Sequence, residues 1–171
     1  GRYAHELEAK LPEKLGKKQK ALLVNSGSSA NLVALSSLGA NSMTDFKMAP
    51  LQKGDEVITV AAGFPTTVNP IVQNGWIPVF VDVDYKTLNA LTDQIKQAKT
   101  SRTRAVMLAH TLGNPYRADE LAQWCEKENL YLIEDCCDAL GSEIETSEGM
   151  KFAGSFGHYA TLSFYPAHHI T

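Results

Sequence analysis

The stretch LYLIEDCCD at residues 130–138 is an apolar run of strand length that ends in acidic and thiol side chains. Apolar residues at helical spacing precede it at 119–128, and another short apolar run lies before them at 104–109. The order strand, helix, strand is typical of a βαβ unit, in which the two strands are parallel. The stretch therefore predicts a parallel sheet with helices on its faces.

The same alternation continues on both sides of this unit. With the strand at residues 130–134, it predicts further strands at 21–24, 56–61, 77–83 and 159–164, and helices at 2–15, 30–38, 66–73 and 91–99. We expect an irregular connection at 40–53, and a loop or small hairpin at 141–157, which is rich in Gly, Ser and Glu. The expected fold class is α/β, a mostly parallel sheet sandwiched by helices.

The composition excludes several classes of protein. Of the 171 residues 44% are hydrophobic and the net charge is −3, so a core can form, and a nucleic-acid partner is not expected. The apolar runs are far shorter than the roughly 18 residues that span a bilayer. An odd count of three cysteines, which match no metal-ligand spacing, favours buried thiols and a cytoplasmic protein without a metal site among them.

Polar residues follow the predicted strands, at the edge where open parallel sheets bind ligands. Gly27 permits a tight turn after the first strand, and Ser28 and Ser29 open a helix whose free amides suit a phosphate. An ordinary serine N-cap is the alternative interpretation. The segment matches neither GxGxxG nor GxxxxGK[ST], so it does not predict a dinucleotide or nucleoside triphosphate site.

Three further side chains at this edge have chemistry of their own. Asp135 could hold a pyridinium N–H, or it could form a helix cap or a surface ion pair. His168, followed by His169, could act as a base at neutral pH, or the pair could be structural. Phe64 lies in a polar turn, where its ring could face a ligand or pack beneath the loop.

Taken in order, these motifs resemble the DegT/DnrJ/EryC1/StrS aminotransferase family, a sugar-modifying branch of the fold type I pyridoxal phosphate enzymes. The residues that carry the resemblance are Ser26-Gly27-Ser28, 54–58, Phe64 and Glu134-Asp135. It extends from about residue 22 to 171. It implies that residues 1–171 are a fragment of the large cofactor-binding domain, with the C-terminal small domain absent.

The resemblance also implies roles for single residues. Phe64 would stack on the pyridine ring, Asp135 would bind its nitrogen, and Asp138 would lie near its hydroxyl. The cofactor phosphate would be held by Gly27, Ser28, Ser29 and Ser163.

One position departs from the family pattern. Ordinary members carry a lysine five residues after the serine that corresponds to Ser163, and this chain has His168 there. Because histidine cannot form a Schiff base with the cofactor, the resemblance implies pyridoxamine 5′-phosphate (PMP) as the working cofactor. It implies the 3-dehydration of a nucleotide-linked 4-keto-6-deoxyhexose in 3,6-dideoxysugar and lipopolysaccharide biosynthesis, with His168 as the catalytic base.

Within the family, residues 61–70, 110–114 and 165–171 are most similar to the subgroup acting on CDP-4-keto-6-deoxyglucose. That subgroup carries a [2Fe-2S] cluster on cysteines that would lie beyond residue 171, and the resemblance further implies a homodimer and a reductase partner. The choice between a CDP-linked and a GDP-linked sugar stays open. The alternatives are a pyridoxal phosphate (PLP)-dependent nucleotide-sugar aminotransferase and a non-catalytic α/β ligand-binding module.

Overall fold

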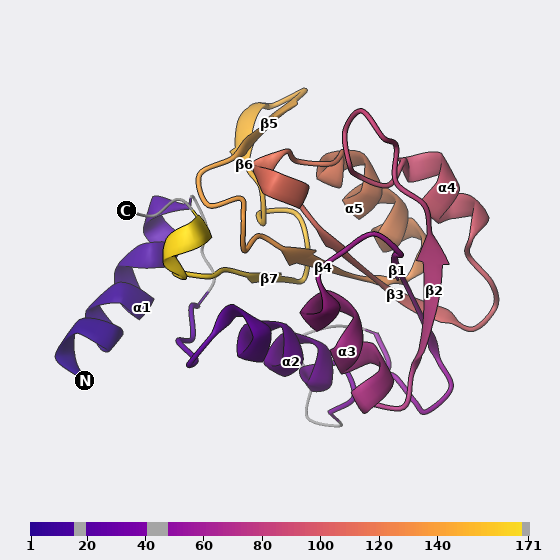
Figure 1. The fold of residues 1–171 in the computed structure, drawn as a ribbon, viewed down its shortest axis with the longest axis horizontal. Coiled ribbons are helices and arrows are strands. Elements are labelled where there is room, and N and C mark those ends of the chain that lie inside the picture. The colour runs from indigo at the N-terminus through magenta and orange to yellow at the C-terminus, as the bar shows by residue number, and fades with distance from the viewer. Residues whose placement is uncertain (16–19, 41–47, 169–171) are drawn as a thin grey trace.

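The computed structural model describes residues 1–15, 20–40 and 48–168 (Figure 1). Its helices are α1 (Arg2–Lys14), α2 (Gly27–Ser37), α3 (Pro65–Gln73), α4 (Thr92–Gln97) and α5 (Ala118–Glu128), with short 3-10 turns η1 (Thr111–Gly113) and η2 (Pro166–His168). Its strands are β1 (Glu56–Val60), β2 (Ile77–Val81), β3 (Thr103–Ala109), β4 (Tyr131–Asp135), β5 (Glu143–Thr146), β6 (Gly149–Phe152) and β7 (Tyr159–Thr161).

Five strands form one sheet in the order β2-β1-β3-β4-β7, and each neighbouring pair is parallel. The helices α2 and α3 lie on one side of this sheet and α4 and α5 on the other (Figure 1). This arrangement confirms the prediction of an α/β fold with helices on both faces. Since all five strands run the same way, their carboxyl ends meet at a single edge.

The two faces of the sheet are built from alternate residues of the same strands. Met107 and Ile133 pack with Leu35 of α2, whereas Leu108 and Leu132 pack in the core that includes α5. Side chains alternate along a strand with a period of two residues, so one apolar run serves both cores. The period also sends Glu134 and Asp135, at the end of β4, to opposite faces.

One predicted strand is wrong. Residues 20–24 form neither a strand nor a helix, and Leu22 is 72% exposed. A strand needs a neighbour for its backbone N–H and C=O groups. In the described part of the chain β7 pairs with β4 alone, and the N–H of Leu23 donates instead to Glu8 Oε1 of α1 at 2.8 Å.

Other expectations hold within a few residues. The segment 141–157 contains the antiparallel hairpin β5–β6, and β7 ends at Thr161, short of the expected 164. The connection expected at 40–53 is irregular at 40 and 48–53, and 41–47 lie outside the described residues. No helix in the described ranges combines the length and apolar character needed to cross a bilayer.

Candidate active site

The carboxylate of Asp135 lies at the carboxyl end of β4 and is 5% exposed. Its Oδ2 accepts hydrogen bonds from Asn31 Nδ2 and from Thr67 Oγ1, both at 2.8 Å, and its Oδ1 accepts the N–H of Cys137 at 3.1 Å. Asn31 belongs to α2 and Thr67 to α3. The Cys137 thiol, a weak donor, also hydrogen bonds with this carboxylate. Each carboxylate oxygen accepts about two bonds, so Oδ1 can still accept one strong donor besides the N–H of Cys137.

Asn31 and Thr67 were not among the predicted site residues, and neither was Thr161, whose hydroxyl donates to Asn31 Oδ1 at 2.6 Å. Asn31 is 1% exposed and interrupts a run of small and apolar residues in α2. A buried polar side chain in such a run is a signal of a specific hydrogen bond. The sequence therefore contained a signal that could have identified Asn31 as a site residue, but none that identified Thr67 or Thr161.

The N-terminus of α2 contacts the chain that follows β7. A Cβ atom on Gly27 would lie 2.9 Å from both Cys137 Sγ and Ser163 Cβ, so only glycine fits there. Ser26 is the N-cap and accepts the N–H of Ser29 at 3.1 Å. The amides of Gly27 and Ser28 begin the helix without intrahelical acceptors, next to Ser163, as an anion site requires. The cap uses the Ser26 hydroxyl and the N–H of Ser29, so it leaves the N–H groups of Gly27 and Ser28 unused by the cap.

His168 and Asp138 form a hydrogen-bonded pair through Nδ1 and Oδ1. His168 lies in η2, and the Tyr165 ring meets its imidazole edge-on with the ring centroids 5.6 Å apart. A carboxylate on Nδ1 fixes the tautomer that carries the proton there, and Nε2 is then the nitrogen with a free lone pair. Asp138 thus has a partner that the sequence did not predict. His169 lies outside the described residues.

Phe64 is the N-cap of α3 and directly follows the turn after β1. Its side chain is 68% exposed, which excludes packing beneath the loop. The next residue, Pro65, takes the first helical position, where its fixed φ suits the helix and its missing N–H costs nothing. The ring is therefore held at a helix start and is free to meet a ligand.

The cysteines are free thiols, and Cys125 and Cys136 are buried as expected, while Cys137 is half-buried. Burial raises the pKa of Cys125 to about 12, and burial together with Asp135 raises the pKa of Cys137 well above its ordinary value. Both thiols therefore stay protonated at neutral pH and are poor nucleophiles.

Glu134 lies on the opposite face of the sheet from Asp135, and its carboxylate binds the backbone of the loop at residues 154–157. His110 Nε2 lies 3.0 Å from Oε2, and the N–H groups of Gly154, Phe156 and Gly157 donate to the same carboxylate. Burial alone would raise its pKa, but these hydrogen bonds and the imidazole lower it below the ordinary value. One side-chain atom each of His110, Glu134 and Cys136 could bind a metal ion, and these atoms lie within 4.8 Å of one another. The oxygens of Glu134, however, already accept hydrogen bonds from backbone N–H groups, so we interpret this cluster as structural.

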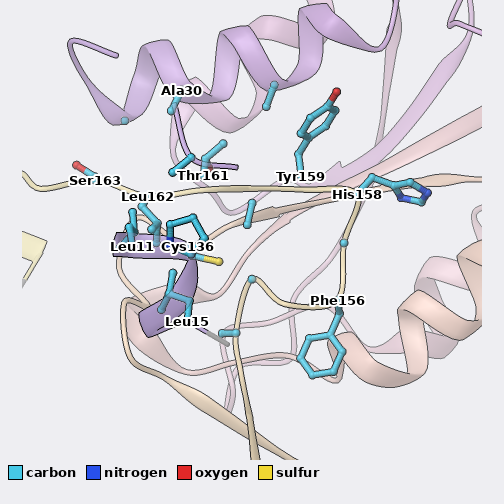
Figure 2. A pocket seen from close by; sticks show the side chains of 18 of the residues that line it. Leu11, Leu15, Ala30, Cys136, Phe156, His158, Tyr159, Thr161, Leu162 and Ser163 are labelled. Carbon is cyan, nitrogen blue, oxygen red and sulfur yellow. The ribbon is translucent and has the colours of Figure 1, made fainter. Parts of the chain in front are cut away.

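A groove of about 1510 Å³ runs between α1 and the outer side of β7 (Figure 2). Leu11 of α1 and Leu15, the C-cap of that helix, line it on one side, and Thr161 and Ser163 line it on the opposite side. It reaches Gly27 and Ser163, but Asp135, Asp138 and His168 do not line it. The groove therefore adjoins the polar cluster at Gly27 and Ser163 and does not contain the carboxylates or the histidine of that cluster.

The sheet edge thus brings together a helix N-terminus, a buried carboxylate and a histidine–aspartate pair. These are features of an α/β domain with a small-molecule site at the carboxyl ends of its strands. The chain belongs to the DegT/DnrJ/EryC1/StrS aminotransferase family, whose profile matches residues 1–171.

Known proteins resemble the chain over most of its length. It is 60% identical to dTDP-4-dehydro-2,6-dideoxy-D-glucose 3-dehydratase of Saccharopolyspora spinosa over 153 residues, 90% of this chain and 32% of that protein. It is 53% identical to the lipopolysaccharide biosynthesis protein RfbH of Salmonella typhimurium over all 171 residues, 37% of that protein. A structure of E. coli GDP-4-keto-6-deoxy-D-mannose-3-dehydratase with bound hydrated PLP matches with a TM-score of 0.79 and 34% identity, covering 92% of this chain and 38% of that one. The chain therefore spans about a third of the length of these relatives.

Proposed function

We propose that the full-length protein is a PMP-dependent 3-dehydratase of a nucleotide-linked 4-keto-6-deoxyhexose. The observation that carries the proposal is the pairing of His168 with Asp138 at the position where family aminotransferases carry a lysine. The two relatives above that are named 3-dehydratases support the same reaction class. We further propose that residues 1–171 form part of a large cofactor-binding domain, since they correspond to about a third of each relative.

The residues of the site fit PMP. The close contact at Gly27 leaves the first amides of α2 and the Ser163 hydroxyl beside one another, and these groups with Ser28 and Ser29 would hold the phosphate. The spare capacity of Asp135 Oδ1 suits a ring N–H, and the exposed Phe64 ring suits stacking on a pyridine. When bound, PMP supplies a primary amine for a keto sugar and an electron-withdrawing pyridine ring.

The protein residues have two tasks in this reaction. Asp135, a buried carboxylate, stabilises a proton on the ring nitrogen and so preserves the ring's electron-withdrawing power. His168 takes a proton at Nε2 while Nδ1–H donates to Asp138, which stabilises the imidazolium that results. His168 would thus hold the proton removed from the reacting carbon when the C3 hydroxyl of the sugar leaves.

The test uses the full-length protein with PMP and nucleotide-linked 4-keto-6-deoxyhexoses, and mass spectrometry to follow loss of the C3 hydroxyl. The wild-type protein should cleave the C3–O bond, and His168→Asn should abolish cleavage while PMP still binds. Transfer of an amino group to the sugar would identify an aminotransferase instead. Failure of the wild-type protein to take up PMP would favour a non-catalytic binding module.

Finer parts of the proposal concern the surroundings of the reaction. A [2Fe-2S] cluster on cysteines outside these 171 residues, a reductase partner and a homodimer are supported by the resemblance to the CDP-sugar dehydrases. Three free thiols support a reducing, cytoplasmic compartment. Iron content, sedimentation of the full-length protein and reduction of the cluster by candidate flavoproteins would test these points in turn.

A further inference from the structure

Asn31 joins three separate elements of the candidate site through one buried amide. Its Nδ2 donates to Asp135 Oδ2 of β4 at 2.8 Å, and its Oδ1 accepts the hydroxyl of Thr161 of β7 at 2.6 Å. The residue itself lies on α2 and is 1% exposed. A buried amide is costly unless both its ends are bonded, so this side chain is confined to one orientation.

The orientation of the amide follows from its two partners. A flipped amide would set Oδ1 against the carboxylate of Asp135, where no hydrogen bond can form. The hydroxyl of Thr161 reinforces the productive orientation because it donates to Oδ1. Together with Thr67, the amide fills Oδ2 of Asp135 and thereby leaves Oδ1 as the oxygen available to a further donor.

Asn31 also sets how α2 lies along β7. Gly27 and Asn31 are four residues apart on one face of α2, about 6 Å along the helix. Thr161 ends β7, and Ser163 follows two residues later, a span of at most about 6.6 Å. Gly27 meets Ser163 and Asn31 meets Thr161, so two matched contacts align the helix with the strand. The spacing between the phosphate-binding turn and Asp135 depends on this alignment.

We propose that Asn31 is a positioning residue of the cofactor site. It directs Asp135 Oδ1 toward the ring nitrogen, and it holds the phosphate-binding turn at Gly27 one helical turn away from its own contact with Asp135. The inference rests on the proposed function, since it concerns the same PMP site. It predicts that loss of the amide weakens PMP binding and lowers the pH at which the bound ring nitrogen loses its proton.

The experiment measures, in the full-length protein, the dissociation constant of PMP and the pH dependence of its bound absorption band. Asn31→Leu should weaken binding about tenfold or more, as expected for one lost hydrogen bond to a charged group, and shift the spectral transition to lower pH. Thr161→Val should cause a smaller loss that Thr161→Ser restores. The double variant should bind PMP no more weakly than Asn31→Leu alone, because both act through one hydrogen-bonded chain.

Asn69→Leu, an exposed substitution on α3, is the matched control and should leave both readouts unchanged. A residue that only stabilised the fold would lower the melting temperature without moving the spectral transition. Wild-type affinity and an unmoved transition in Asn31→Leu would overturn the inference. If Asn31→Leu fails to fold, the nearly isosteric Thr161→Val provides the test instead. Wild-type PMP affinity and an unmoved spectral transition in Thr161→Val would then overturn the inference. A wild-type protein that binds no PMP would instead contradict the proposed function.

Discussion

His168 and Asp138 are hydrogen bonded through Nδ1 and Oδ1 although they are 30 residues apart in the chain. One follows β7 and the other follows β4, two strands that are neighbours in the sheet. Such a pair converts an imidazole of undefined tautomer into an oriented base. In the proposed reaction the carboxylate of Asp138 therefore orients the base, and His168 acts as the base.

Asp138→Asn should lower the rate of C3–O cleavage by roughly a hundredfold or more, because an amide neither fixes the tautomer nor stabilises an imidazolium. Single-turnover kinetics with saturating PMP in the full-length protein would measure the effect. Affinity for PMP should change far less than the rate.

The control for Asp138→Asn is Asp93→Asn, which removes an exposed carboxylate from the first turn of α4. It should leave the rate unchanged. A rate for Asp138→Asn within twofold of wild type would remove Asp138 from the positioning of His168.

Gly27→Ala should weaken PMP binding through its phosphate, because the added Cβ would lie 2.9 Å from atoms of Cys137 and Ser163. The first turn of α2 must then move away from Ser163, which separates two groups expected to share the phosphate. Titration of the full-length protein with PMP measures the loss.

Gly39→Ala is the control for Gly27→Ala. The Cβ atom added at position 39 would lie no closer than 3.3 Å to any other side chain, the nearest being Trp76, and Gly39 is not among the candidate site residues. It should bind PMP normally. Equal affinity in the two variants would mean that the close approach at Gly27 plays no part in phosphate binding.

His158 predicts a pH dependence of stability. Its Nδ1 accepts the N–H of Leu132 at 3.1 Å, which only the neutral ring can do, and burial lowers its pKa below the ordinary 6.5. The unfolded chain then binds more protons than the folded one between the two pKa values, so stability falls as pH drops below about 6.5. Urea unfolding across pH 5 to 7.5 would measure this slope.

Replacement of His158 with Gln retains an acceptor for Leu132 but removes the titration. The slope between pH 5 and 6.5 should become shallower in His158→Gln. An identical slope in the variant and the wild-type protein would assign the pH dependence to other groups.

Glu134→Gln should lower the free energy of unfolding by about 3 kcal/mol, because it leaves buried hydrogen-bond donors without an acceptor. The amide would turn a donor toward backbone N–H groups of Gly154, Phe156 or Gly157 and would leave His110 without its carboxylate. Denaturant unfolding gives the value.

Glu148→Gln is the surface counterpart, because Glu148 pairs with Lys151 in an exposed position. It should have almost no effect on the same measurement. A loss for Glu134→Gln as small as that of the surface variant would contradict the anchoring role of Glu134.

Local patterns were sufficient to predict most of the sheet and the edge at which the candidate site residues lie. Strands 104–109 and 130–134 were expected within a residue or two of β3 and β4. Apolar periodicity reports which sides of an element are buried, and this is a property of neighbouring residues. The strand expected at 21–24 failed because pairing depends on a neighbouring strand, and none in the described residues pairs with it.

The alternation of strands and helices, and with it the sheet edge where Gly27, Asp135 and His168 lie, could therefore be predicted from the sequence alone. The hydrogen-bond partner of each polar side chain depends on the packing of the whole chain and could not be predicted in this way. The contact of Asn31 with Asp135 spans 104 residues, and that with Thr161 spans 130. Such bonds follow from strand order and from the register between α2 and β7, which packing of the whole chain sets.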